Sequence, residues 1–563
     1  MTLPLLATIV LAVLALGYTA YGRFIARQYA LDDARLTPAV EVNDGIDFVP
    51  TRRFYLMGQH FSAIAAAGPI VGPIQACLTW GWVPCILWIG LGVVFVGAVH
   101  DVTALVASVR HGAGSIAQLA HRYLGRRAWL SLTSFIWIAL VYVIVAFADV
   151  TANTFLGKVE ELPGEVPFHK GGGVAAAATA YLLLAVAMGY VQRRWKPRTW
   201  VLAAVFVPLT LGCVALGTNG AVSRLLLLDG TGWQVAILVY CVIASLLPVD
   251  LLLQPRGFLG GFILYLALAV GVVGIFFGEG TIAQPAFRTP PDGPTASLFP
   301  FLFVTIACGA CSGFHGLVCG GTTSKQIRKE THCHPVGYGA MLLEAFVALV
   351  ALATILSVAP AAVGGRGASV LYGDGMASFL TLLIGEEHRR FALVFGSMVF
   401  STFVFDTLDV ATRLGRYLLQ ELFGAKGPAG GLTTTLVTAG VPLAILLAGG
   451  GGAWVRYWTL FGSANQLLAA LTLLACTVWL RRTGRRSWYT LAPALLLLVT
   501  TSTSLAFQAR TGLASLGSDG VGAAGINGLL AIVMLGLAGL FLADTIRALR
   551  RPAEPEGDPA AAA

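Results

Sequence analysis

Residues 58–73 read Gly58-Gln-His-Phe-Ser-Ala-Ile-Ala-Ala-Ala-Gly68-Pro69-Ile-Val-Gly72-Pro73, an apolar stretch with two Gly-Pro pairs four residues apart. Each proline lacks an amide donor, and the residue before a proline avoids the helical region, so we expect a helix to break at Gly68 and Gly72. A simple proline kink is the alternative. The doubled pair close to polar side chains favours an unwound binding segment, formed by His60, Ser62, Gly68, Pro69, Gly72 and Pro73.

The composition requires a membrane environment. Of the 563 residues, 57% are hydrophobic and 11% are charged, and the mean hydropathy is +0.80. Such a chain lacks the polar surface that a soluble domain presents to water. Apolar runs of about 20 residues, the length that crosses a bilayer core, recur along almost the whole chain. We therefore predict an all-α, polytopic membrane helix bundle, with one transmembrane domain over residues 1–551 and a disordered cytoplasmic tail over 552–563.

Fifteen runs are candidate spans, and the first is expected to stay in place with its amino end outside. It has no basic residue before it and Arg23 and Arg27 after it, the reverse of a secretory signal peptide. Residues 368–385 remain open, as a further span or as an interfacial helix. The fifteen predicted spans cover residues 2–22, 56–79, 82–109, 129–156, 173–191, 199–217, 232–253, 258–278, 298–320, 337–360, 391–411, 431–449, 454–480, 488–507 and 523–546.

The distribution of basic residues supports this topology. With the amino end outside, the inner segments, which include a cytoplasmic loop at 23–55, hold 27 of the 36 lysines and arginines. Cytoplasmic loops of membrane proteins carry such an excess. An error in one span would invert every later loop, so the agreement predicts that the amino terminus lies outside and the carboxyl terminus in the cytoplasm.

A second interrupted segment follows at residues 308–325, Cys308-Gly-Ala-Cys-Ser-Gly-Phe-His315-Gly-Leu-Val-Cys-Gly320-Gly-Thr-Thr-Ser-Lys325. Small residues permit close backbone approach, and the polar side chains offer hydrogen-bonding groups at membrane depth. This span runs inward and the Gly-Pro span runs outward, the arrangement of an inverted-repeat transporter. We predict binding groups at Ser312, Gly313, His315, Thr322 and Thr323.

A third polar segment, Tyr457-Trp-Thr-Leu-Phe-Gly-Ser-Ala-Asn465-Gln466, follows the glycines at 449–452. Its amide pair lies in an apolar helix after an expected flexible outer turn. Substrate binding and helix–helix hydrogen bonding explain Asn465 and Gln466 equally well.

Charged groups within spans cost about 2.5–3.5 kcal/mol each on insertion scales, so each needs an explanation. Asp409 and Arg413 have the i, i+4 spacing of a same-face pair. That pair and Asp250 have an alternative explanation as helix-end groups at the inner interface. For the deeper Asp101, Asp149 and Glu344 a functional role is favoured. The charged or titratable residues within predicted spans are His100, Asp101, Asp149, Asp250, Glu344, Asp406 and Asp409.

Other classes of protein are disfavoured. The net charge of +9 reflects basic loops beside hydrophobic runs, without the aromatic-interleaved stripe of a nucleic-acid binder. The nine scattered cysteines argue against a disulfide framework. Cys308 and Cys311 lie in a span and His332 and His334 in a loop beyond it, which disfavours a zinc site. No Walker or dinucleotide fingerprint is present, and we predict neither metal nor cofactor.

Several motifs together resemble the carbon starvation protein A family. The resemblance implies proton-coupled uptake of pyruvate or peptides across the bacterial inner membrane, on a fold related to the LeuT-like amino acid–polyamine–organocation transporters. Four positions depart from the family pattern, namely Gln59, His100, Asp250 and Asp406, so substrate and coupling ion do not carry over directly. The motifs are Phe48-Val-Pro-Thr51, the stretch Gly58–Pro73, Gly97-Ala-Val-His-Asp101, Cys308–His315, Gly321-Thr-Thr323, Gly337-Tyr-Gly-Ala-Met341 with Glu344, Thr407–Tyr417 and Ala464-Asn-Gln466.

These features lead to one transport hypothesis. A small carboxylate binds exposed amides and half-helix amino ends at 68–72 and 313–316. His60 and His315 contact it or titrate, because imidazole changes charge near neutral pH. Asp101, Asp149 and Glu344, with Asp409 and Arg413 as a further pair, are the candidates for coupling to H⁺, and Na⁺ is left open. A membrane-embedded enzyme or a nutrient sensor is the alternative, although no spacing brings a nucleophile, a base and an orienting group together.

Overall fold

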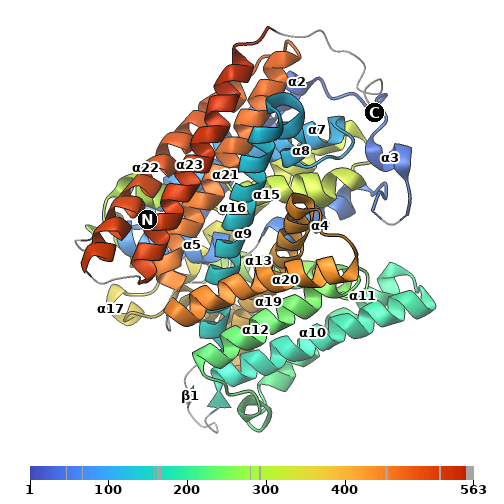
Figure 1. Ribbon diagram of the computed structural model, residues 1–563. Coiled ribbons are helices and arrows are strands. Elements are labelled where there is room, and N and C mark those ends of the chain that lie inside the picture. The colour runs from blue at the N-terminus through green and yellow to red at the C-terminus, as the bar shows by residue number, and fades with distance from the viewer. Residues whose placement is uncertain are drawn as a thin grey trace.

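The computed structural model is a bundle of helices (Figure 1). It describes residues 1–45, 47–65, 67–156, 159–160, 168–278, 280–290, 293, 295–449, 454–518 and 522–552. Twelve described helices are long and apolar enough to cross a membrane. A thirteenth candidate is a pair of helices bent by 49° at a short break, Arg53–Ile64 and Gly68–Trp80. The predicted tail lies almost wholly outside the described residues.

The amino-terminal half is helical apart from one short strand pairing, in which β1 Val159–Glu160 runs antiparallel to β2 Phe168–His169. Its helical elements are α1 Leu3–Leu16, η1 Gly17–Gly22, α2 Arg23–Tyr29, α3 Pro38–Val42, α4 Arg53–Ile64, α5 Gly68–Trp80, α6 Trp82–Leu87, η2 Trp88–Gly97, α7 Ala98–Arg110, α8 Ile116–Leu124, α9 Arg126–Phe155, α10 Lys170–Trp195, α11 Thr199–Gly217, η3 Val222–Arg224, α12 Gly230–Leu246 and α13 Leu253–Phe277.

In the carboxyl-terminal half, the described elements are all helical and are joined by loops. Its elements are α14 Leu298–Thr305, α15 Gly313–Val318, η4 Cys319–Thr323, η5 Ser324–Gln326, η6 Glu330–His332, η7 His334–Gly339, α16 Ala340–Leu356, α17 Pro360–Val363, α18 Ala368–Ile384, η8 Glu386–His388, α19 Arg389–Phe423, α20 Gly427–Gly449, α21 Trp454–Arg482, α22 Trp488–Ser518 and α23 Ala523–Leu549.

The helices divide into a core and a periphery. The apolar stretch of α21 is entirely buried, and those of α16 and α19 nearly so, whereas α1, α11 and α23 expose most of theirs. In Figure 1, α21, α22 and α23 lie side by side (orange to red), and α10, α12 and α20 pack around α19. Helix α9 contacts both groups. A helix that is buried on all sides has protein neighbours that can form hydrogen bonds with its polar side chains. Helix α21 is buried in this way.

The loops predicted to be cytoplasmic meet at one end of the molecule. Tyr29, at the end of α2, receives hydrogen bonds at its carbonyl from Arg110 and from Arg485, which follows α21. The backbone of Val49 and Thr51 bonds to the loop 325–326. Segments far apart in sequence therefore share this end, called here the Tyr29 end.

The opposite end, called here the Gly280 end, collects the loops predicted to lie outside. Leu3 at the amino terminus bonds to the Gly280 carbonyl, Trp82 bonds to Pro285, and Ala283 bonds to the carbonyl of Leu356, where α16 ends. The structure thus sorts these loops into the same two groups as the distribution of basic residues.

Three predicted spans need correction. The first helix continues beyond residue 22 to Tyr29, so its basic residues lie within helix. The run 232–253 stops at Leu246, because Pro248 follows and cannot donate the next helical hydrogen bond. The run 298–320 is two short helices, α14 and α15, with irregular backbone between them.

Helix α18, left open by the sequence, packs at the Gly280 end of the bundle. Its Gly375 packs on Thr354 near the end of α16, its Phe379 packs on Gly274 near the end of α13, and its Asp374 pairs with Lys170 at the start of α10. It also packs against the first part of α19, where Gly373 meets Ser397.

Candidate functional site

Two broken helices cross the bundle side by side and in opposite directions. At the Gly280 end, Trp80 of α5 donates to the Ala296 carbonyl just before α14. At the Tyr29 end, Thr51 just before α4 bonds to Gln326, just after α15 and its π-helical extension η4. The predicted pair of antiparallel broken helices is therefore confirmed.

The breaks of the two helices touch. A Cβ added at Gly68 would overlap the side chain of Cys308, and one added at Gly72 would overlap the backbone of Thr305. Glycine at both positions lets the two backbones approach, as small residues do between membrane helices. The polar groups freed at each break therefore lie beside the other break.

The position of the first break differs from the prediction in detail. Helix α5 begins at Gly68 with Pro69 in its first turn, and it continues through Gly72 and Pro73, so the expectation that Gly72 is unwound is wrong. The first four amides of a helix need no intrahelical partner, so Pro69 costs no hydrogen bond there. Only Pro73, which lies farther inside α5, leaves a helical hydrogen bond unformed. The break lies instead just before Gly68.

Asn465 and Gln466 of α21 stabilise the second broken helix. Asn465 Oδ1 accepts from the Phe314 amide at 2.9 Å, and its Nδ2 donates to Ser312 Oγ at 3.0 Å, which satisfies the start of α15. Gln466 donates to the Phe303 carbonyl at 2.9 Å near the end of α14. Of the two explanations that the sequence left open, helix–helix hydrogen bonding is what the structure shows for both side chains.

A buried charged triad lies next to this break. His315 of α15 places Nδ1 2.8 Å from Asp101 Oδ2 of α7 and Nε2 3.1 Å from Glu344 Oε2 of α16. His100 adds Nδ1 2.7 Å from Asp101 Oδ1. All four side chains are fully buried. The structure thus joins three residues that the sequence singled out separately.

The triad has two ways to arrange its protons. With both carboxylates ionised, the two ring nitrogens of His315 must both donate, which is the form of a charged imidazolium. With Glu344 protonated, a neutral His315 can donate to Asp101 and accept from Glu344. These two forms hold the same number of protons and the same net charge of minus one. A further proton on Glu344, with His315 still charged, makes the triad neutral, and His315 Nε2–H can still donate to the carbonyl oxygen of the protonated carboxyl group.

His60 lies on the first broken helix and close to the triad. Its Nδ1 is 2.8 Å from Thr323 Oγ1 of η4, and it lies within electrostatic reach of Asp101 and His315. Among the described residues, His60 Nε2, Ser62 Oγ and His100 Nε2 are buried without a hydrogen-bond partner. The same holds for both carboxylate oxygens of Glu344, whose contact with His315 at 3.1 Å is an ion pair. Thr322 instead bonds to the Val318 carbonyl of its own helix. Buried polar atoms without partners mark places where a solute or water can bind.

Asp149 lies apart from the triad's contacts. Its carboxylate accepts from the Trp454 amide at the start of α21 at 2.7 Å and from Gln234 Nε2 at 2.6 Å. A carboxylate at a helix amino end satisfies a free amide and the helix dipole. Asp149 thus caps α21 through a tertiary contact that the sequence did not predict. The glycine turn at 450–453 lies outside the described residues.

The predicted pairing of Asp409 with Arg413 is wrong. Asp409 pairs with Arg256 of α13 and accepts from Tyr240 at 2.8 Å. Arg413 donates to the carbonyls of Ala244 and Leu247 at the end of α12. The i, i+4 spacing allowed the pair, but the free carbonyls at that helix end and a fully buried arginine compete for the two side chains.

Arg256 is a buried charged residue that was not recognised from the sequence. It is fully buried and bonds both Asp406 and Asp409 of α19. Two acidic residues at i, i+3 inside one apolar helix were the available signal for a buried cation opposite, since unpaired charges at such depth are costly.

Irregular helix turns accompany the triad. The π-helical segment η2 precedes α7, which carries Asp101; η4 follows α15, which carries His315; and η7 precedes α16, which carries Glu344. Single π turns occur often at functional sites, because they redirect side chains and free backbone groups. All three helices of the triad have one.

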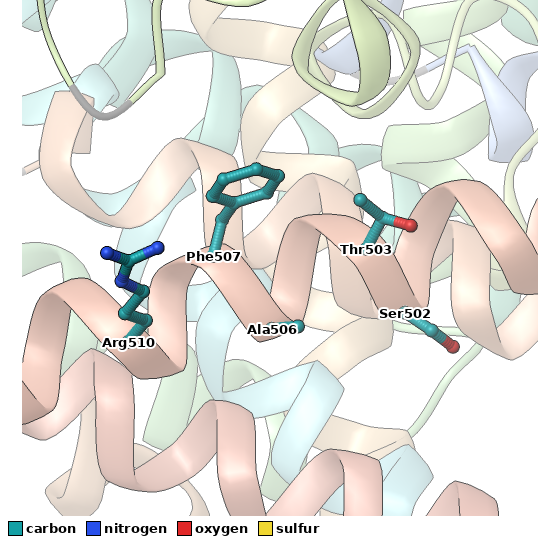
Figure 2. Close-up of a pocket in the computed structure, with 5 residues that line it drawn as sticks. All are labelled: Ser502, Thr503, Ala506, Phe507 and Arg510. Atoms are coloured by element: carbon teal, nitrogen blue, oxygen red, sulfur yellow. The ribbon is translucent and has the colours of Figure 1, made fainter.

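No described group of three or more histidine, cysteine or acidic side chains could hold a metal ion. All nine cysteines are free thiols. A pocket on the outer face of α22, lined by Ser502, Thr503, Ala506, Phe507 and Arg510, lies on one surface strip of that helix (Figure 2). None of these five residues belongs to the triad or to the two breaks.

Comparison with known proteins identifies the family of this chain. The sequence profile described as carbon starvation protein CstA matches residues 3–366 and 360–504. The chain belongs to the CstA family. The peptide transporter CstA of Bacillus subtilis (strain 168) is 30% identical over 598 residues, covering 96% of each chain. The pyruvate/proton symporter BtsT of Escherichia coli (strain K12) is 30% identical over 595 residues, covering 88% of this chain and 80% of that one.

A solved structure is also similar at low identity. A mutant of the Eremococcus coleocola manganese transporter aligns with a TM-score of 0.45 and 13% identity, over 90% of this chain and 99% of that chain.

The four departures from the CstA pattern lie in different surroundings. His100 joins the triad and Asp406 pairs with Arg256. Asp250 forms a surface pair with Arg193, as a helix-end group would, and Gln59 is exposed. Two of these four residues therefore take part in ionic contacts of the interior, and two lie on the surface.

Proposed function

We propose that this chain is a secondary active transporter that imports a small carboxylate, pyruvate or a short peptide, by proton symport. The observation that carries the proposal is the buried Asp101–His315–Glu344 triad beside the contact of two broken helices. Two relatives support it, because one is named a peptide transporter and the other a pyruvate/proton symporter. A membrane-embedded group that can gain one proton and keep its contacts suits proton coupling.

We propose fifteen crossings, with the Tyr29 end in the cytoplasm of a bacterium and the Gly280 end in the periplasm. The twelve long helices, the two broken helices and α12 make up the fifteen, and α18 lies at the outer interface. The excess of basic residues in the loops of the Tyr29 end supports this orientation. The antiparallel broken helices support an inverted-repeat, LeuT-like arrangement.

The solute is proposed to bind between the breaks, near His60, Ser62 and the start of α5. The amino end of α5 offers amides and a positive dipole end to a carboxylate. The amino end of α15 is already capped by Asn465 Oδ1, so it contributes less than the sequence suggested. Asn465, Gln466, Ser312 and Thr323 then shape the site rather than contact the solute.

The net charge of the triad determines whether the proton or the carboxylate binds first. With His315 protonated and both carboxylates ionised, the triad has a net charge of minus one, and described arginines and lysines make no ion pair with it. An anion entering beside it is repelled until a proton neutralises Glu344 or Asp101. A proton therefore binds first and the carboxylate second, and both leave on the inner side.

Uptake of labelled pyruvate into proteoliposomes tests the function. We expect an inward proton gradient to raise uptake and an inward Na⁺ gradient at equal pH to leave it unchanged. A dipeptide such as Ala-Ala, added in excess, shows by competition whether peptides share the site. Uptake indifferent to the pH gradient, to Na⁺ and to voltage would refute symport.

An enzyme or a sensor remains the alternative. The buried histidines and carboxylates are its only support, and the named relatives are transporters. Incubating the purified protein with pyruvate or a dipeptide separates the classes, because transport leaves the molecule unchanged and an enzyme yields a product.

A further inference from the structure

A strap formed by residues 30–45 and 47–52 lies along the loop 325–331 at the Tyr29 end. The Thr37 hydroxyl donates to the Ile327 carbonyl at 2.6 Å, and the amides of Val49 and Thr51 donate to the carbonyls of residues 325 and 326. The strap leads directly into α4, and the loop follows the second broken helix through η4 and η5. The contact therefore joins the same end of both broken helices.

Glu330 is the charged centre of this contact. Its side chain is buried, and Oε1 lies 2.7 Å from Arg110 Nε and 3.0 Å from Arg35 NH1. Oε2 accepts from the Asp32 amide at 2.7 Å and from Arg110 NH2 at 3.2 Å. One carboxylate thus joins the strap, the end of α7 and the loop before α16.

Arg110 extends the connection to a fourth segment. Besides Glu330, it donates to the Tyr29 carbonyl at 2.7 Å, which also accepts from Arg485 between α21 and α22. Arg110 is at the end of α7, the helix that carries Asp101. Helix α7 therefore connects the ion pair of Glu330, at its end, with the triad residue Asp101.

The strap lies next to the chain that leads from the proposed solute site toward this end of the protein. Thr323, the partner of His60, is followed by Ser324, which is fully buried, and then by Lys325, which bonds to the strap. Residues 323–325 therefore connect the proposed solute site to the strap by one short stretch of chain. While Glu330 holds the strap, the segment stays covered.

We propose that Glu330, with Arg110, is the inner gate of the transporter, the positioning residue that holds the cytoplasmic end closed until the solute is released. The proposal rests on the proposed function for the direction of transport and for the side on which the Tyr29 end lies. A buried carboxylate that loses its charge leaves two arginines without their partner, which breaks such a contact more strongly than loss of a surface pair.

Accessibility of Ser324 tests the gate. A Ser324→Cys probe in a Cys213→Ser chain is treated with a membrane-impermeant maleimide in inverted and in right-side-out vesicles. The eight other cysteines are buried, and each gate variant is corrected by the same variant without the probe. We expect Glu330→Gln to raise the labelling rate at least tenfold in inverted vesicles only.

Matched variants distinguish opening of the gate from a general loosening of the strap. Asp33→Asn removes the exposed pair with Lys329 on the same strap and should change labelling less than twofold. Arg35→Gln, which removes the more exposed partner of Glu330, should raise it a few-fold, and Glu330→Asp should stay near the parent. Detergent-solubilised variants should elute at the parent position.

The outcomes separate this proposal from the proposed function. Labelling at the parent rate in Glu330→Gln and Arg35→Gln, or an equal rise in Asp33→Asn, would overturn the gate. Labelling only from right-side-out vesicles would overturn it as an inner gate. Labelling requires neither solute nor protons, so the expected labelling in a protein that fails to move pyruvate would support the gate and refute the substrate.

Discussion

A Cβ atom added at Gly72 would lie 2.5 Å from the carbonyl oxygen of Thr305, so the first broken helix reaches the second only because it has no side chain there. The contact joins α5 to the end of α14, where regular hydrogen bonding stops. The relative positions of the two breaks, and of the triad beside them, depend on this close contact between α5 and α14.

The first prediction concerns that approach. Gly72→Ala should destabilise the protein by about 1–3 kcal/mol, because the methyl group must displace backbone. It should also reduce pyruvate uptake strongly while protein remains in the membrane. Gly440→Ala is the control, since nothing lies within 4 Å of a Cβ there. Thermal unfolding in detergent measures the difference, and equal melting temperatures for the two variants would contradict the packing argument.

The second prediction concerns Glu344. Glu344→Gln keeps the shape of the side chain but removes the exchangeable proton. We expect exchange of labelled for unlabelled pyruvate to continue, while accumulation driven by an inward proton gradient falls to background. Glu387→Gln, on an exposed glutamate, should accumulate pyruvate normally. Accumulation by Glu344→Gln at the level of the unmodified protein would exclude Glu344 as the coupling group.

The third prediction concerns the buried arginine. Arg256→Gln leaves Asp406 and Asp409 without their cation and should cost about 3–5 kcal/mol of stability, as breaking a buried pair does. Arg193→Gln removes only the half-exposed pair with Asp250 and should change stability by less than about 1 kcal/mol. Unfolding in denaturant compares the two, and similar midpoints would show that Arg256 is not structurally required.

The fourth prediction concerns Asn465. Asn465→Ala removes the acceptor for the Phe314 amide and should cost about 1 kcal/mol or more, the usual cost of losing a helix cap. Because the cap also fixes the start of the helix that carries His315, uptake should fall. Asn153→Ala is the control, since among the described residues the Asn153 side chain bonds only to the Asp149 carbonyl of its own helix. A loss of uptake in both variants alike would argue against a specific role for the cap.

The site could be predicted from the sequence in part. The Gly-Pro pairs and the run Cys308–Lys325 located both breaks, because proline and glycine act on the backbone within a few residues. Asp101, His315 and Glu344 were recognised individually, since charge inside an apolar run is costly wherever the run lies. Their mutual contacts were not predictable, and neither was the partner of Asp409, because i, i+4 spacing only permits a pair.

The sequence by itself determined that this chain lies in a membrane, where its helices break and how its loops divide between two ends. These properties follow from local hydrophobicity, backbone chemistry and charge. Only the tertiary structure decided that His315 lies between Asp101 and Glu344, that Arg256 neutralises two aspartates, and that Asp149 caps α21. These contacts join helices far apart in the chain, and packing selects among the partners that composition allows.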